Sequence, residues 1–236
     1  VVQLTDKHPH SGYKIFRNLK RSADYYNRSQ RTLEDLIEDS RADGLKATLK
    51  ERRMWGKMRM TPTDVEDIQG FTALINGQST KQNWTGLFKA GEKVRLRLIN
   101  SSAMTYFDVR VPGLKMTVVQ ADGNDVKPVV VDELRIAVAE TYDVIVEPTE
   151  AKPFAFVAES IDRSGQVVAT LAPKPGMRAQ APKLRAVPVL TMKDMGMSHD
   201  SMGHGAMDSG DAVAPTAVDH STMDHGPTES PKTDSG

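Results

Sequence analysis

The sequence predicts an all-β fold, an antiparallel β-sandwich or barrel. Between residues 71 and 148, apolar and polar residues alternate in short runs, so that every second side chain faces the same side of a strand. Turn-forming Gly, Pro, Asn and Asp residues separate these runs at short intervals. Short strands that each carry one apolar face are typical of antiparallel sheets packed around a common core.

The clearest alternation begins at Val94, where Val94, Leu96 and Leu98 lie on one face and Arg95 and Arg97 on the other. Further strands are predicted from the same period of two. Their apolar sets are Phe107, Val109 and Val111; Met116 and Val118; Leu134, Ile136 and Val138; and Tyr142, Val144 and Val146. Residues 154–160 and 166–171 supply the last two predicted strands.

The region before this alternation favours short helices. Thr32 followed by Asp35 forms a capping-box pattern, after which apolar residues recur at helical spacing. Asp43 and Gly44 end this helix, and a second one is predicted from Leu45. We expect the aromatic residues of this region to form the packing of a small helical insert.

His8-Pro9-His10 lies in a polar loop after a short first strand. Two imidazoles two residues apart on an extended chain can bind neighbouring metal ions. Here a proline separates them, and the further histidine and aromatic partners of such a site are missing nearby. We therefore interpret this segment as a solvated loop.

The composition excludes several functions. The 236 residues include 31 basic and 31 acidic ones, so the net charge gives no general attraction to nucleic acid. The absence of cysteine excludes disulfides, zinc–thiolate sites and a cysteine nucleophile. No apolar run reaches the length of a membrane span.

Three segments resemble a known family. They read LINGQSTKQNWTGLFKAGEKVRLRLIN, AMTYFDVRVPGLKMTVVQADG and VDELRIAVAETYDVIVEP. In this order they are similar to the middle cupredoxin domain of the bacterial copper-resistance protein A family, which are periplasmic laccase-like multicopper oxidases. The resemblance covers most of residues 1–171. It implies a cupredoxin-like Greek-key β-sandwich, a periplasmic location and copper as the cofactor.

In this family three cupredoxin domains follow one another. The resemblance places the mononuclear copper, held by Cys, His and Met, in the third domain, and the trinuclear copper cluster between the first and third. This chain resembles the middle domain only, and the first and third domains would be its partners in a longer protein. We therefore assign no catalytic and no cofactor-binding residue to it, and expect it to be inactive alone.

The C-terminal residues have a different composition. From Met192 onward there are two basic and eight acidic residues, and six of the twelve methionines and four of the six histidines lie there. The spacers are Gly, Ser and Asp, which cannot bury a core, so we expect residues 192–236 to be disordered without a ligand. A solvated low-complexity tail with incidental methionines is the alternative.

The tail contains the predicted metal ligands. Thioethers select Cu(I), imidazole binds both copper states, and nearby carboxylates attract the cation. The candidate copper ligands are Met192, Met195, Met197, His199, Met202, His204, Met207, His220, Met223 and His225.

The sequence thus divides into five parts. They are an initial strand and loop (1–12), a helical insert and connection (13–70), the core of the sandwich (71–172), a Pro-rich linker (173–191) and the Met/His/Asp-rich tail (192–236). The predicted function is that of a fragment of a copper-resistance multicopper oxidase. A stand-alone periplasmic copper sponge or chaperone, and a purely structural sandwich, are the alternatives.

Overall fold

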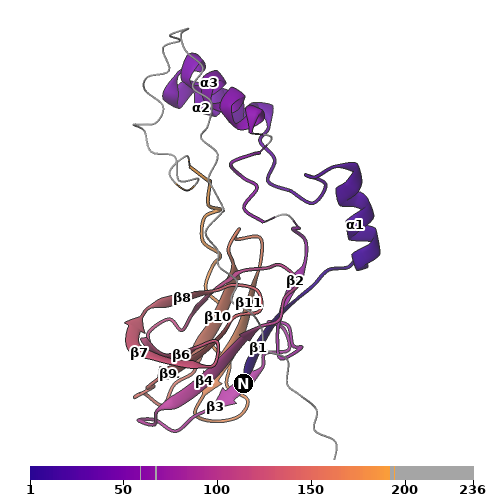
Figure 1. The fold of residues 1–236 in the computed structure, drawn as a ribbon. Coiled ribbons are helices and arrows are strands. Elements are labelled where there is room, and N and C mark those ends of the chain that lie inside the picture. Colours follow the sequence, from indigo (N-terminus) through magenta and orange to yellow (C-terminus); the bar gives the residue numbers. More distant parts are fainter. Residues whose placement is uncertain (59, 67, 192–193, 195–236) are drawn as a thin grey trace, which may run out of the picture. The chain divides into compact units, whose positions relative to one another are not determined.

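The computed structural model describes residues 1–58, 60–66, 68–191 and 194, and within them the strands form two sheets (Figure 1). The six-stranded sheet contains, in spatial order, β2 (Thr72–Ile75), β1 (Val2–Lys7), β4 (Val94–Asn100), β9 (Thr141–Val146), β6 (Met116–Ala121) and β7 (Asn124–Val131). The five-stranded sheet contains β3 (Thr85–Leu87), β11 (Gln166–Ala172), β10 (Phe154–Ser160), β5 (Phe107–Arg110) and β8 (Glu133–Ile136).

The chain crosses repeatedly between the two sheets. The steps from β4 to β5, β5 to β6, β7 to β8, β8 to β9 and β9 to β10 each change sheet, which is Greek-key connectivity. Most pairs are antiparallel, whereas β1 pairs parallel with β4 and β3 parallel with β11. The predicted cupredoxin-like Greek-key β-sandwich is confirmed, with two packed sheets rather than a barrel.

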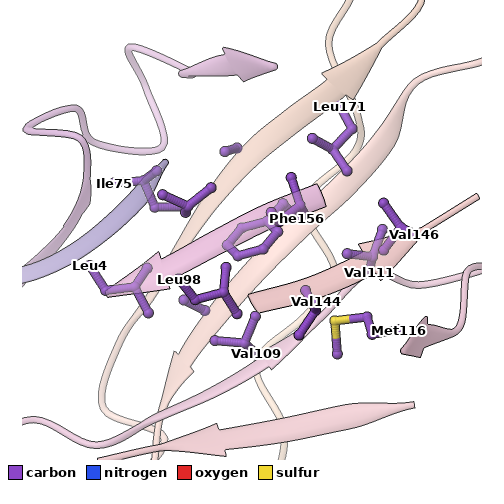
Figure 2. Packing of buried hydrophobic residues seen from close by; sticks show 14 of the residues in the cluster. Leu4, Ile75, Leu98, Val109, Val111, Met116, Val144, Val146, Phe156 and Leu171 are labelled. Atoms are coloured by element: carbon purple, nitrogen blue, oxygen red, sulfur yellow. The ribbon is translucent and has the colours of Figure 1, made fainter. Parts of the chain in front are cut away.

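The core lies between the sheets and uses the predicted apolar faces (Figure 2). Leu98, Met116 and Val144 come from the six-stranded sheet, and Val109 and Phe156 face them from the other. All five are fully buried. Since burial of such side chains contributes ~1.5–3 kcal/mol each, this layer is the main source of stability.

The hairpin between β6 and β7 follows from its turn residues. Asp122 and Gly123 have φ angles of 47° and 79°, as a two-residue turn with both central residues in the left-handed region requires. Strand β7 lies at the edge of its sheet and contains Pro128. An edge strand accommodates a proline, because on its outer side no partner strand needs the backbone N–H that proline lacks.

Three helices precede β2: α1 (Gly12–Arg21), α2 (Leu33–Asp43) and α3 (Leu45–Lys57). The predicted capping box is present, because the Thr32 hydroxyl accepts from the Asp35 backbone N–H and the Asp35 carboxylate accepts from that of Thr32. Gly44 has a φ of 85° and separates α2 from α3.

The helical region buries only part of its apolar side chains. Tyr26 and Trp55 are 4% and 3% exposed, which confirms the expected packing role for these two. The expectation is wrong for Tyr13, Phe16 and Tyr25, which are 76%, 56% and 53% exposed. Leu33 and Leu45 are likewise 78% and 58% exposed. Among the described residues, no helix is long and apolar enough to cross a membrane.

Candidate functional site

The ten predicted copper ligands of the tail lie outside the described residues. They are Met192, Met195, Met197, His199, Met202, His204, Met207, His220, Met223 and His225, and their role stays a prediction. The site that the structure describes therefore consists of the two remaining histidines, a network of buried charges and the segment that leads to Met192.

His8 and His10 are half-buried, so the interpretation of their loop as simply solvated is wrong. The His10 backbone N–H donates to Nδ1 of His8 at 3.0 Å, and the two ring centroids are 5.1 Å apart. Nδ1 of His10 lies 3.0 Å from the hydroxyl oxygen of Tyr26, which also accepts from the Asn18 side chain at 2.9 Å. Loss of water contact and the nearby charge of Lys14 lower the pKa of His10.

The described part of the chain does not fit the copper centres that the resemblance implies. The sequence contains no cysteine for a mononuclear site. In residues 1–58, 60–66, 68–191 and 194, no three His, Cys, Asp or Glu side chains converge as metal ligands. His8 and His10 are the only histidines there, and both contact protein groups instead. We derive no copper-dependent step from this part of the molecule.

The most extensive polar structure of the sandwich surrounds Asp108 on β5. This carboxylate is 1% exposed and accepts from Arg135 at 2.8 and 3.1 Å. Arg163 contacts it at 2.6 Å. Burial alone would raise the pKa of Asp108, but the bonds from Arg135 and Arg163 hold it below its usual value.

Glu159 on β10 forms the second half of this network. Its side chain is fully buried, and Arg110 donates to it at 2.8 Å. Arg185 donates to it twice, from its backbone N–H at 2.9 Å and from Nε at 2.5 Å. Burial opposes ionisation, but these donors hold the pKa of Glu159 below its ordinary value. The guanidinium of Arg185 also contacts Glu133 at 2.8 Å.

Arg185 belongs to residues 178–190, here called the strap, which are bound to the sandwich at several points. The Ala179 N–H donates to the Thr170 hydroxyl at 3.1 Å, and the Pro182 carbonyl accepts from Gln166 at 2.8 Å. The Leu190 N–H donates to the carbonyl of Pro62 at 2.8 Å. The segment is Pro-rich, as predicted for a linker, but it is held in place along much of its length.

Sequence reasoning missed this network and the strap. Arg185 contacts residues 26 and 52 positions earlier in the chain, and no local pattern indicates such contacts. The one usable signal is Glu159 itself, an acidic residue within the apolar run of β10, because a buried carboxylate requires a cationic partner.

A further buried acid, Glu66, lies in the connection between α3 and β2. It is 6% exposed and lines a pocket with Met104, Tyr106 and Ile161. Burial raises its pKa to about 9, and the neighbouring carboxylate of Asp162 adds to this effect. Glu66 is therefore protonated at neutral pH.

Comparison with known proteins places this sandwich in a family. The family model described as multicopper oxidase matches residues 22–175, well over half of the chain. The chain belongs to the multicopper oxidase family. Among curated relatives, it is 54% identical over 207 residues to a copper resistance protein A homolog of Pseudomonas syringae pv. tomato. That match covers 86% of this chain and 35% of the relative.

A further curated relative matches with similar identity and coverage. Copper resistance protein A of Escherichia coli is 54% identical over 202 residues, with 84% of this chain and 33% of the relative covered. The chain thus spans about a third of the length of the curated relatives it matches. Among solved multicopper oxidase structures, Fet3p, which functions in iron import, has a TM-score of 0.49 at 19% identity, with 79% of this chain and 29% of that one covered.

Proposed function

We propose that this chain provides a scaffold domain and a copper-binding segment to a copper-resistance multicopper oxidase. The observation that carries the proposal is the 54% identity to copper resistance protein A over 86% of the chain, joined to a Met- and His-rich tail. Copper is the cofactor of the family, and the tail carries the side chains suited to Cu(I).

The tail is assigned the copper-binding role because of its chemistry. Met195, Met197, Met202 and Met207 lie two to five residues apart with small spacers between most of them. A chain of this spacing can bring two or three thioethers to one ion, since closing such short loops costs only on the order of 1 kcal/mol each. Thioethers also stay reduced ligands in an oxidising compartment such as the periplasm, where thiols form disulfides.

The sandwich is assigned a supporting role. Its described residues offer no set of copper ligands, whereas Glu159 and Asp108 bind the strap through Arg185. The strap ends at Leu190, two residues before Met192, and the bond from the Leu190 N–H to the Pro62 carbonyl holds that end. Together with the network at Arg185, this bond supports a role of the sandwich in holding the chain just before the predicted copper-binding segment. Reduction of oxygen would then belong to the first and third cupredoxin domains of a longer protein.

An oxygen-consumption assay tests this division of roles. We expect the copper-loaded chain to consume no more oxygen than free copper, because electrons cannot pass to an oxygen site without the Cys-bound copper. The product of the complete reading frame should consume oxygen with a phenol or Cu(I) as substrate. Consumption by this chain that His8→Ala or His10→Ala abolishes would contradict the proposal.

The alternative, a stand-alone copper sponge, can be distinguished from an oxidase fragment by the sequence of the complete reading frame. A multicopper oxidase requires the reading frame to continue into a domain with a His-Cys-His sequence, whereas a sponge does not. A reading frame without that sequence would favour the sponge.

A further inference from the structure

Helices α2 and α3 form an antiparallel hairpin in which only Gly44 separates them, and they lie next to each other (Figure 1). The side chain of Arg52 on α3 joins the two helices. It donates to the Asp39 carboxylate on α2 at 3.2 Å and to the carbonyl of Thr32, the N-cap of α2, at 3.4 Å. The faces that carry Asp39 and Arg52 are therefore the inner faces of the hairpin.

Each helix of the hairpin leaves two aliphatic side chains in solvent. Leu33 and Ile37 form the α2 row, and Leu45 and Leu49 form the α3 row. All four side chains are half or more exposed. The two residues of each row are four positions apart, so they are neighbours on one helix face. Scattered apolar residues are normal on a surface, whereas a continuous group of them indicates a contact site.

The two rows lie on the same side of the hairpin. The α2 row lies three residues before and one residue after Leu36, which belongs to the half-buried face of its helix. The α3 row has the same relation to Thr48, which is buried. Since a helix turns by about 100° per residue, both rows are rotated in the same sense from the inner face, by roughly a quarter turn. In two antiparallel helices that face each other, this rotation leads to the same side, so the rows form one apolar stripe.

The charges of the hairpin are divided between its helices. Helix α2 contains five acidic residues and one basic residue, and α3 contains five basic residues and one acidic residue. On the inner faces, Asp39 and Arg52 are paired. Glu34 and Arg53, by contrast, are exposed beside the apolar stripe, and neither has an ion-pair partner within the described part of the chain. The outer side of the hairpin thus has one acidic and one basic edge.

A second copy of the hairpin is complementary to this surface. In a twofold pair, α2 packs either on α2 or on α3 of the second copy. The first arrangement brings two acidic helices together, which repel each other, whereas the second places an acidic helix on a basic one twice. Glu34 lies ten residues before Gly44 and Arg53 lies nine after it. In the second arrangement, therefore, Glu34 is level with Arg53 of the second copy.

We infer that two copies of this chain associate through their α2–α3 hairpins as an antiparallel four-helix bundle. The apolar stripes of both copies form the core of the bundle, as in helix bundles generally. Glu34 of each copy pairs with Arg53 of the other at its edge. This association requires neither copper nor the proposed role of the tail.

Sedimentation velocity of the whole chain over a range of concentrations tests this association, with EDTA present so that metal ions do not link the copies. The unmodified chain should change from monomer to dimer as its concentration rises. Ile37→Gln combined with Leu49→Gln should weaken the dimer by at least about tenfold, because four aliphatic side chains per dimer leave the core. Leu87→Gln combined with Val130→Gln is the matched control, since it changes two exposed aliphatic residues of the sandwich and should leave the dimer unchanged.

Charge reversal tests the arrangement of the helices separately. Glu34→Arg and Arg53→Glu should each weaken the dimer several-fold, because each creates two like-charged contacts, and the two changes combined should restore it. A combined variant that dimerises as weakly as the single ones would show that α2 does not pack on α3 of the second copy, and the bundle would be wrong. An unmodified chain that stays monomeric at every concentration would overturn the inference. A dimer that Ile37→Gln with Leu49→Gln leaves unchanged would overturn it as well.

Discussion

At the scale of single residues, the buried carboxylates give the stability of this sandwich two opposite pH dependences. Asp108 and Glu159 have lowered pKa values because arginines surround them. Their contribution is complete above the ordinary carboxyl values of 3.8 and 4.5 and is lost as the pH falls through the lowered folded-state values. Glu66, whose pKa is raised to about 9, acts in the other direction.

The first prediction concerns Glu66. Between pH 4.5 and about 9 the folded chain retains a proton that the unfolded chain releases, so the stability from this group falls as the pH rises through that window. The slope is on the order of 1 kcal/mol per pH unit. Glu66→Gln removes it, so the variant should lose less stability than the unmodified chain between pH 5.5 and 8.5.

Urea unfolding at both pH values measures this difference. Glu92→Gln, which changes an exposed glutamate, is the control and should keep the slope of the unmodified chain. If Glu66→Gln keeps that slope too, then Glu66 is ionised in the folded state and the account of its burial is incorrect.

At the scale of elements, the Arg185 side chain makes the charged attachment of the strap to the sandwich. Nε of Arg185 donates to the buried Glu159 and its guanidinium contacts Glu133, whereas the backbone N–H bond from Arg185 to Glu159 would survive a substitution. Arg185→Gln should therefore destabilise the chain by about 1–3 kcal/mol, since a hydrogen-bonded buried charge loses a partner. It should also release the strap locally, and trypsin should then cut after Lys183 much faster than in the unmodified chain.

Arg41→Gln is the matched control, because Arg41 is exposed in the last turn of α2. It should leave the cutting rate at Lys183 unchanged. A similar rate at Lys183 in the unmodified chain and in Arg185→Gln would mean that the network does not hold the strap.

The same elements show how far sequence reasoning extends. Strands such as β4 and β9 could be predicted, because one buried face imposes an alternation that is visible locally. The capping box at Thr32 and the break at Gly44 are equally local. The contacts of Arg185 with Glu159 and of His10 with Tyr26 could not be predicted, because they depend on segments brought together only by the fold.

At the scale of the whole molecule, family and function rest on different kinds of observation. The family follows from a match over residues 22–175, which contains strands β2 to β11 of the sandwich but none of the ten predicted copper ligands. The copper-binding role rests on the composition of residues 192–236, which include six methionines and four histidines. The central claim is therefore that the sandwich acts as a scaffold and that the tail binds copper.

Competition with a Cu(I) chelator tests this claim most directly. The comparison uses the whole chain, a variant with all six tail methionines changed to leucine, and a control variant with Met54→Leu, Met58→Leu and Met60→Leu. The account predicts that the chain and the control bind Cu(I) alike, and that the tail variant loses most of the bound Cu(I), because leucine keeps the bulk and removes the sulfur. Equal Cu(I) stoichiometry and affinity in all three proteins would contradict it.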